Sequence, residues 1–337
     1  MPQPNPIDLA DALTQSIAAR AQLLPRLLAE GTDCYRLLHG TTEGWPGFTV
    51  DRYGPLLWVQ SFREPLPEGG LEALSQAADQ ALGTPLIPVW NHRARGPAPA
   101  YEQDPRAAGV HIAREGGLAY EISPRPWGKD PWLFLDFRAT RRWVRAQAEG
   151  RSVLNLFAYT CGVGIAALAG GATEVWNVDF AASSLAVGRR NVAHNDLADG
   201  AFTTVQEDVI PTVRQLAGLP VKGRAARRRR FGRFEPKSFD VVVLDPPTWA
   251  TSPFGAIDPV RDYASLLKPA LLATRPGGKL VATNHVSTVD VQDWTERMAR
   301  SAQKAGRPIT NLEILPPDAD FPSTDGRHPL KVAIIEA

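Results

Sequence analysis

Residues 153–164 read Val-Leu-Asn-Leu-Phe-Ala-Tyr-Thr-Cys-Gly-Val-Gly. The first five are mostly apolar, which is typical of a strand buried on both faces of a parallel sheet. A polar turn with two glycines follows, and the small and apolar residues 165–169 begin a helix. Because glycine has no side chain, such a turn lets a nucleotide-like ligand approach bare backbone at the carboxyl end of a strand. An ordinary tight connection is the alternative, since short glycine motifs occur often by chance.

Acidic residues end the next two expected strands. Asp179 follows the apolar run 175–178, where an acid can accept both ribose hydroxyls of an adenosine. Asp208 follows a third short strand, residues 202–205, and could bind the adenine amino group. Each acid could instead cap the helix that comes after it. Both interpretations stay open at this point.

The fourth strand leads into the most specific motif of the chain. Residues 239–249 read Phe-Asp-Val-Val-Val-Leu-Asp-Pro-Pro-Thr-Trp. The two prolines, Pro246 and Pro247, fix the backbone φ angle and remove two amide donors. We therefore expect a stiff loop that presents the Asp245 carboxylate to a substrate, with Trp249 offering a face for stacking.

The alternation of strands and helices from residue 153 onward predicts an α/β fold with a mostly parallel, Rossmann-like sheet. An antiparallel pair at the C-terminal end completes it. At 337 residues the chain is long enough for two domains. We expect a helical extension at 1–34 with an amphipathic helix at 7–28, which Pro25 could kink or end early. A smaller α+β domain at 35–114 that recognises RNA or substrate follows, and then a catalytic domain at 115–337 that opens with a strand at 118–123.

Charge is balanced over the whole chain but not locally. The net charge is +1, yet residues 222–237 hold eight basic residues and one acid. A solvated loop is the ordinary explanation of such a run. We predict that it contacts RNA through Arg227, Arg228, Arg229 and Arg230, because clustered arginines bind phosphate. Since the run precedes the strand of Asp245, we expect it at the opposite end of the sheet from the Asp245 loop.

The cysteine count favours a cytoplasmic protein. Cys34 and Cys161 are the only cysteines, and neither they nor the six histidines show metal-ligand spacing. We therefore expect no metal. The sequence shows no signal peptide and no apolar stretch long enough to cross a membrane, so no membrane partner is expected. It leaves the oligomeric state open, with a homodimer as one option.

Taken together, the glycine turn, the strand-end acids and the Asp-Pro-Pro loop resemble the class I S-adenosylmethionine-dependent methyltransferases. The turn lacks a full Gly-x-Gly-x-x-Gly, which argues against a nicotinamide dinucleotide. Residues 35–38 and 44–54 further resemble the central domain of a family of bacterial 23S ribosomal RNA methyltransferases that modify cytosine C5 or guanine N7. Residues 134–138 match that family's Phe-Leu-Asp-x-Arg segment, which lies over the cofactor. The stretch before Tyr35 is too short for the N-terminal PUA domain of many members.

This resemblance spans about residues 35–337. It implies S-adenosylmethionine as the cofactor and RNA, in the form of 23S rRNA or the large ribosomal subunit, as the partner. The implied cofactor site consists of the turn, the strand-end acids with their neighbours, and the 134–138 segment: Phe134, Arg138, Asn155, Phe157, Ala158, Tyr159, Thr160, Gly162, Asp179, Phe180, Asp208, Val209 and Asp245.

A missing thiol indicates the acceptor atom. Methylation of cytosine C5 requires a covalent cysteine adduct, because that carbon is a poor nucleophile. Family members that do this carry a cysteine at the end of the fifth strand, where this chain has Thr-Asn-His at 283–285. We therefore predict methylation of a purine nitrogen, with Asp245, Pro246, Pro247 and Asn284 as catalytic residues. His285 could also lie near the acceptor or be merely structural.

Two alternatives remain open on the sequence alone. One is a methyltransferase of a protein side chain or small molecule, because an Asp-Pro-Pro loop also suits planar amides. The other is a non-catalytic RNA-binding protein with a decayed cofactor site. The presence of all three acids, Asp179, Asp208 and Asp245, argues against decay.

Overall fold

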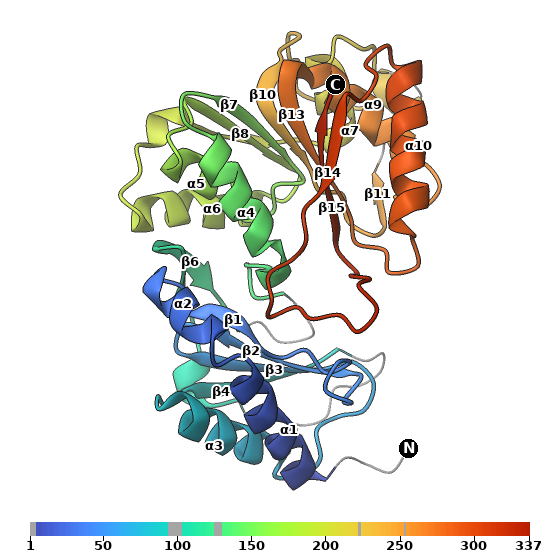
Figure 1. Ribbon diagram of the computed structural model, residues 1–337. Helices are drawn as coiled ribbons and strands as arrows, with labels where there is room; N and C mark the ends of the chain where they lie inside the picture. The colour runs from blue at the N-terminus through green and yellow to red at the C-terminus, as the bar shows by residue number, and fades with distance from the viewer. Residues whose placement is uncertain (1–4, 94–102, 125–129, 222–223, 253) are drawn as a thin grey trace. The chain divides into compact units, whose positions relative to one another are not determined.

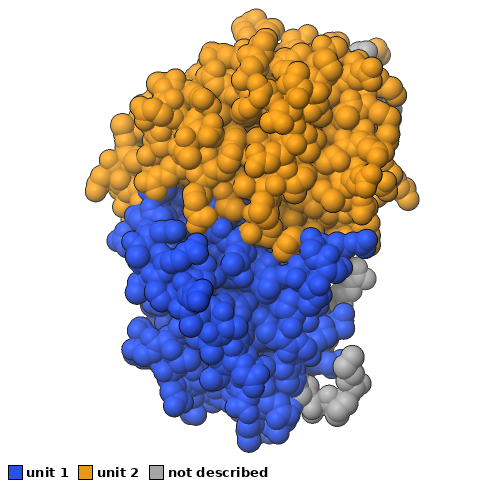
Figure 2. Space-filling model, in the orientation of Figure 1, with its two compact units in different colours: residues 1–138, 318–327 blue, residues 139–317, 328–337 orange. Residues whose placement is uncertain are grey.

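The computed structural model describes residues 5–93, 103–124, 130–221, 224–252 and 254–337. The chain forms two compact units, which Figure 2 shows in blue and orange. Unit 1 comprises Met1–Arg138 with Asp318–Arg327, and unit 2 comprises Ala139–Pro317 with His328–Ala337. This division differs from the expected boundary at residue 115. Residues 115–138 group with the N-terminal part of the chain, and so does the distant segment 318–327.

Unit 1 is built on a four-stranded sheet in the order β1-β2-β3-β4. The first three strands are antiparallel, and β4 runs parallel to β3 because helix α3 lies between them in the chain. The elements of this unit, in chain order, are α1 (Pro6–Ala19), α2 (Leu23–Ala29), β1 (Cys34–Leu38), β2 (Phe48–Tyr53), β3 (Leu56–Ser61), α3 (Gly70–Leu82), β4 (Ile87–His92), the 3₁₀ turn η1 (Pro105–Ala107), β5 (His111–Glu115), β6 (Leu118–Ile122) and the 3₁₀ turn η2 (Leu135–Phe137).

Two expectations for unit 1 need correction. The single helix expected at 7–28 is two helices, and the break falls before Pro25, which lies in the first turn of α2, where a missing amide is tolerated. The strand expected to open the catalytic domain is β6, which pairs with β5 as a hairpin of unit 1. Hydrophobic spacing indicates both segments, and Pro25 marks the region where the helix breaks, but spacing does not show which unit the strand joins.

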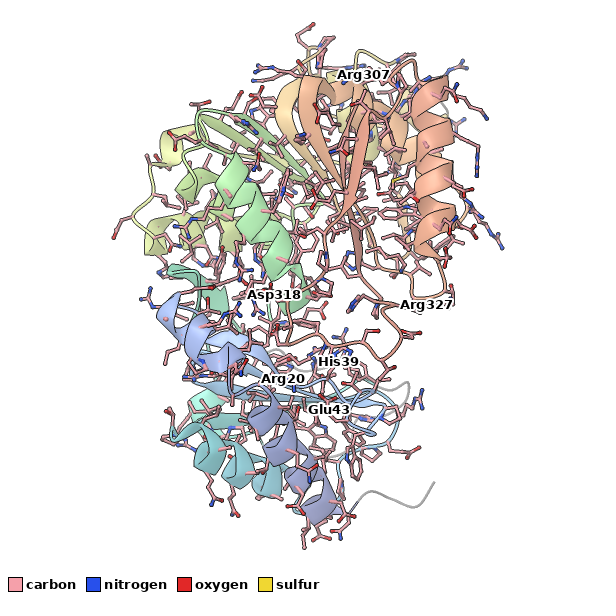
Figure 3. All side chains as sticks on the ribbon, in the orientation of Figure 1. Arg20, His39, Glu43, Arg307, Asp318 and Arg327 are labelled. Carbon is pink, nitrogen blue, oxygen red and sulfur yellow. The ribbon has the colours of Figure 1, made fainter. Side chains whose placement is uncertain are left out.

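A buried cluster of charges holds the segment 318–327 in unit 1. Arg138 is 1% exposed, and its guanidinium donates to the carboxylates of Asp318, labelled in Figure 3, and Asp320. Asp320 is fully buried and also accepts from the backbone N–H of Arg36 at 2.9 Å. Because burying an arginine and an aspartate is costly unless each is paired, these contacts must form together.

Unit 2 contains a seven-stranded sheet in the order β14-β15-β13-β10-β7-β8-β9. The strands from β13 to β9 in this order are parallel, whereas β15 is antiparallel to β13 and to β14. The predicted α/β class, with its mostly parallel sheet and antiparallel C-terminal pair, is therefore confirmed. The strands are β7 (Ser152–Leu156), β8 (Glu174–Asp179), β9 (Phe202–Gln206), β10 (Phe239–Leu244), β13 (Thr274–Asn284), β14 (Asn311–Ile314) and β15 (Lys331–Glu336), with a small hairpin of β11 (Ala250–Ser252) and β12 (Gly255–Ile257).

Helices cover both faces of this sheet (Figure 1). Helices α7, α9 and α10 pack on the apolar face that includes Leu154, Val242 and Leu280. On the opposite face, Gly164 of α5 lies so close to β8 that a Cβ atom there would stand 2.1 Å from Oδ1 of Asn177. The helices begin and end as follows: α4 (Arg138–Gln147), α5 (Gly162–Ala169), α6 (Ala182–His194), the 3₁₀ turn η3 (Asp199–Ala201), α7 (Val209–Leu216), α8 (Arg224–Arg228), α9 (Tyr263–Ala273) and α10 (Val291–Lys304).

Candidate active site

Three predicted acids meet at one edge of the unit 2 sheet. Strands β9, β8, β7 and β10 are parallel neighbours, so their carboxyl ends lie along the same edge. Asp179 is the last residue of β8, Asp208 caps the helix that follows β9, and Asp245 comes directly after β10. Ligands of open α/β sheets bind at this edge. The expected site therefore has a common location.

The turn after β7 has an unusual backbone. Phe157, Tyr159 and Cys161 have φ angles of 62°, 48° and 62°, in a region that favours glycine. The Tyr159 N–H donates to Oδ2 of Asp179 at 2.9 Å, and the Ala181 N–H donates to Oδ1 at 2.8 Å. The two hydrogen bonds to Asp179 hold this strained backbone in place. Residues with strained backbone angles cluster at ligand sites.

The residues of this edge fit an adenosine cofactor. Asp179 is 7% exposed, and burial raises the pKa of its carboxyl group even though the backbone hydrogen bonds oppose the shift. Each of its oxygens has a further lone pair with which to accept a ribose hydroxyl. Phe180, the next residue, is 72% exposed and offers a ring to an adenine. Ala158 and Thr160 are buried in the turn, and Gly162 begins α5.

Asp208 caps the N-terminus of helix α7, which is the alternative role considered for it. Its Oδ1 accepts from the Ile210 N–H at 2.9 Å, and the buried Val209 begins helix α7. Oδ2 of Asp208 has no hydrogen-bond partner among the residues that the structure describes. A cap of this kind therefore leaves one carboxylate oxygen for an adenine amino group.

Two side chains of β13 and its following loop fix Asp245. Thr283 Oγ1 donates to Oδ1 of Asp245, and Nε2 of His285 lies 2.7 Å from the same oxygen. Oδ2 has no hydrogen-bond partner within the described parts of the chain. Sequence alone does not indicate a role for Thr283 and leaves the role of His285 open. The signal that could have found them is the alternation of a strand, which places residues 283 and 285 on one side.

Asn284, predicted to be catalytic, has a different environment. Its side chain is fully buried, Nδ2 donates to the Pro259 carbonyl at 3.2 Å, and Oδ1 accepts from the Val286 N–H at 2.9 Å. Both polar atoms thus support the loop. The structure gives Asn284 a structural contact and brings its two neighbours to Asp245 instead.

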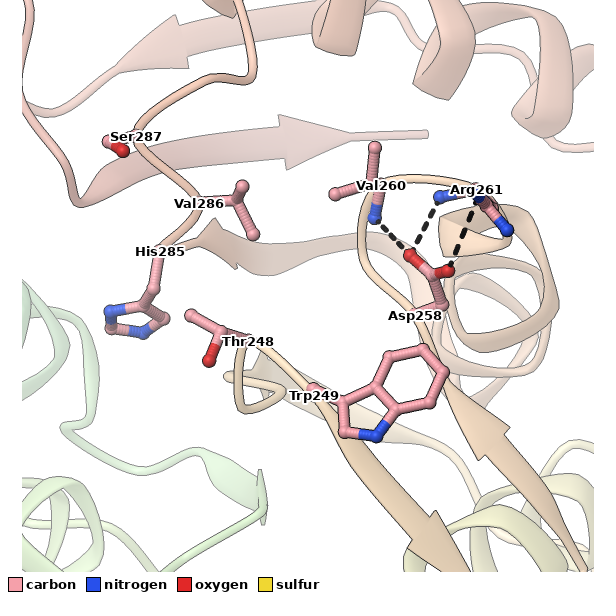
Figure 4. Close-up of a pocket in the computed structure, with 8 residues that line it drawn as sticks. All are labelled: Thr248, Trp249, Asp258, Val260, Arg261, His285, Val286 and Ser287. Carbon is pink, nitrogen blue, oxygen red and sulfur yellow. Dashed lines mark hydrogen bonds and ion pairs between the residues drawn. The ribbon is translucent and has the colours of Figure 1, made fainter. Parts of the chain in front are cut away.

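We call Asp245 with its two partners, Thr283 and His285, the Asp245 corner. An open groove of about 590 Å³ lies next to it and is lined in part by His285 (Figure 4). Trp249, on the loop after Pro246 and Pro247, is 60% exposed, and Figure 4 shows Thr248 between it and His285. An exposed indole in a groove that is also lined by His285, the partner of Asp245, can hold a planar group by stacking. The groove is lined by Thr248, Trp249, Asp258, Val260, Arg261, His285, Val286 and Ser287.

Three predicted cofactor residues lie within a strand or in the other unit. Asn155 is 2% exposed within β7 and donates to Oδ1 of Asn177 at 3.0 Å, so its amide joins two strands. Arg138 is held in the charge cluster of unit 1, and Phe134, also in unit 1, is 45% exposed. Their roles in cofactor binding stay predictions.

The position expected for the basic run is wrong in part. Lys237 pairs with Glu174 at the amino end of β8, as expected for a segment opposite the Asp245 loop. The Gly232 N–H, however, donates to Oε1 of Glu207 at 2.7 Å, directly before Asp208 at the carboxyl edge. The run therefore crosses from one end of the sheet to the other. Lys222 lies outside the described residues.

The thiol of Cys161 is not available as a nucleophile. Cys161 is fully buried beneath Gly188 of α6, and this burial raises the pKa of its thiol well above the usual range. A neutral, enclosed thiol is a poor nucleophile.

In the ranges that the structure covers, no three His, Cys, Asp or Glu residues gather as metal ligands. The described helices are each too short or too polar to span a bilayer.

Comparisons with known proteins identify the family of this chain. Residues 35–335 match the family model of S-adenosylmethionine-dependent methyltransferases. A Deinococcus radiodurans protein named ribosomal RNA large subunit methyltransferase is 32% identical, over 90% of this chain and 73% of its own length. An Aeromonas hydrophila protein named ribosomal RNA large subunit methyltransferase I is 30% identical, over 87% of this chain and 71% of its own.

Solved structures show the same fold. A Streptococcus mutans S-adenosylmethionine-dependent methyltransferase superposes with a TM-score of 0.76 at 22% identity, over 100% of this chain and 83% of its own. SMU.776, assigned as a methyltransferase and solved with SAH, gives a TM-score of 0.79 at the same identity and coverage. The chain therefore belongs to the S-adenosylmethionine-dependent methyltransferase family, and S-adenosylmethionine is its cofactor.

Proposed function

We propose that this enzyme methylates a base of 23S rRNA at a purine nitrogen. The substrate class is supported by the two relatives named as large subunit ribosomal RNA methyltransferases, which align over most of this chain. The exposed Trp249 beside the groove supports a base as the acceptor, because every base has a face that can stack on an aromatic ring.

The side chains around Asp245 support a purine nitrogen, and not cytosine C5, as the atom that is methylated. A carboxylate fixed by Thr283 and His285 stands there, and no thiol comes from β13 or its loop. Cys161 is enclosed, and Cys34 is buried in unit 1. Without a thiolate the covalent route to cytosine C5 is closed, whereas a purine nitrogen attacks with its own lone pair.

The chain's residues have few tasks in such a reaction. S-adenosylmethionine, when bound, supplies a methyl group already activated on a sulfonium. Asp179 and Phe180 would hold its adenosine. Asp245, through Oδ2, would accept a hydrogen bond from an N–H of the base and, where the attacking nitrogen bears a proton, receive that proton. Pro246 and Pro247 stiffen the loop, so the base is aligned by a surface that does not need to reorganise.

Transfer of labelled methyl groups tests this proposal. Purified enzyme and methyl-labelled S-adenosylmethionine are incubated with deproteinised 23S rRNA and, separately, with large ribosomal subunits. Label in RNA, recovered as a methylpurine after digestion to nucleosides, is the expected result, and the better of the two substrates identifies the physiological form. Label in neither RNA would overturn the proposal. A homodimer remains a prediction, which light scattering of the purified protein would check.

A further inference from the structure

A stretch of arginines lies anchored beside the cofactor site. We name residues 227–233 the arginine segment. Within it, the Gly232 N–H donates to Glu207, which directly precedes Asp208 at the carboxyl edge. The ring of Phe231 meets that of Phe254 edge to face, with centroids 5.2 Å apart. Phe254 lies in the β11–β12 hairpin, which follows Trp249. Both anchors are thus tied to elements that build the site.

Further hydrogen bonds fix the path of the backbone at residues 232–234. Nε2 of Gln215, on α7, donates to the Gly232 carbonyl at 3.0 Å, and Oε1 of Gln215 accepts from the Phe234 N–H at 3.3 Å. A Cβ atom on Gly232 would lie 2.8 Å from Oε1 of Glu207, so a larger residue would disturb this contact. The guanidinium of Arg233 stacks 4.7 Å from the centre of the Phe231 ring. The C-terminal end of the arginine segment, residues 231–233, is therefore docked on α7 and Glu207, and the four consecutive arginines directly precede this anchored end.

Its charges are not neutralised by the protein. Arg227, Arg228, Arg229 and Arg230 are exposed. None of the four has an ion pair or side-chain hydrogen bond within the described part of the chain. In a chain with a net charge of +1, four adjacent guanidinium groups form a strong local positive field. A polyanion with closely spaced charges is the partner that suits this field.

We propose that the arginine segment binds the phosphate backbone of RNA next to the nucleotide that enters the groove at Asp245. This inference rests on the proposed function. RNA is favoured over an acidic protein because the same hairpin connects the arginine segment, through Phe254, to the exposed Trp249. Guanidinium groups for phosphates and an aromatic face for a base are the two elements of single-strand recognition.

Salt dependence of binding tests the charges. The variant R227Q/R228Q/R229Q/R230Q leaves Gly232 and Phe231 in place. Its matched control, R151Q/K268Q/R300Q/K304Q, removes the same charge from exposed residues elsewhere in unit 2. Binding of a fluorescein-labelled poly(U) of about 20 nucleotides is followed by anisotropy between 50 and 200 mM salt. Each phosphate contact contributes about 0.7 to the slope of log affinity against log salt on a single strand.

We expect the slope of the first variant to be shallower than that of the wild type by about 3, and that of the control to change by less than about 1. Over the stated salt range the wild type would lose about fiftyfold more affinity than the variant. Equal slopes for the two variants would overturn the inference, because the contribution would then be that of net charge alone.

A second variant tests the anchoring. F231A/F254A keeps every arginine but removes the aromatic contact. We expect unchanged affinity for poly(U) and a methylation rate on 23S rRNA reduced about tenfold, because the arginines would no longer be held beside the groove. An unchanged rate would contradict the docked arrangement. Should the wild type methylate no RNA at all, the proposed function fails, and the salt slopes still decide whether the arginines bind RNA.

Discussion

Nε2 of His285 lies 2.7 Å from Oδ1 of Asp245, although the two residues are 40 positions apart in the chain. The parallel pairing of β10 with β13, in which Leu244 stands opposite Ala282, brings them together. Thr283 donates to the same carboxylate oxygen. One oxygen of the acid is thus held in place by two side chains, and the second oxygen is the one that we propose for the substrate.

Replacing Asp245 by asparagine tests the role of that second oxygen. D245N keeps the shape but cannot receive a proton and is a weaker acceptor, so we expect kcat to fall by about a hundredfold or more. The cofactor affinity, measured by calorimetry with S-adenosylhomocysteine, should change much less. The matched control is D262N, at an exposed acid without a side-chain cap bond. Equal effects of both substitutions on kcat would contradict a role for Asp245.

We propose that His285 acts on the reaction by positioning Asp245. We expect H285A to lower kcat about tenfold with little change in KM for RNA, because orientation is lost and not affinity. H285Q, whose amide can donate to the same oxygen, should recover part of the loss. S287A, on the rim of the same groove, serves as the control. A rise in KM at constant kcat would instead assign His285 to binding of the base.

Several parts of the site were predictable because they follow from local sequence. The apolar run of β7, the glycine turn, the acid that ends β8 and the Asp-Pro-Pro loop each lie within one short segment. Parallel pairing then places them at one edge without further information. The confirmed sheet and family rest on these local signals.

The rest depends on contacts between distant residues, which one sequence does not show. The ion pair of Arg138 with Asp320 spans 182 positions and places the segment 318–327 in unit 1. The hydrogen bond from Gly232 to Glu207 moves the arginine segment to the carboxyl edge. Asn284 is predicted to be catalytic because it stands where relatives have a cysteine, but its neighbours Thr283 and His285 are the residues that contact Asp245.

Cofactor affinity should depend on the ionisation of Asp179. Burial raises the pKa of this carboxyl group above its usual 3.8, so it takes up a proton at a higher pH than a free aspartate does. Only the carboxylate can accept from both ribose hydroxyls. Affinity is therefore complete at neutral pH and should be lost as the pH falls through the raised pKa.

The measurement is calorimetry with S-adenosylhomocysteine between pH 4 and 8, with near-ultraviolet circular dichroism to verify that the protein stays folded. In D179N we expect weaker binding, by about tenfold at neutral pH, with a smaller dependence on pH. An affinity of the wild type that stays constant down to pH 4 would show that Asp179 does not bind the ribose.

Breaking the buried charge cluster should destabilise unit 1. D320A removes the fully buried one of the two carboxylates that pair with Arg138, and it also removes the acceptor of the Arg36 N–H, at a cost of about 3–5 kcal/mol in the free energy of unfolding. Urea denaturation followed by circular dichroism measures this change. E296Q, which removes the exposed partner of Arg300, should alter stability by less than about 0.5 kcal/mol. Similar midpoints for both variants would contradict the importance of the cluster.

We propose above all that the enzyme binds S-adenosylmethionine at the carboxyl edge of the unit 2 sheet and transfers its methyl group to a purine nitrogen at the Asp245 corner. Mass mapping of modified nucleosides in 23S rRNA, from a deletion strain and from its complemented parent, tests it most directly. We expect one methylpurine to disappear on deletion, to return with the wild-type gene and to stay absent with D245N. Loss of a 5-methylcytosine at a single site, with every methylpurine retained, would contradict the account.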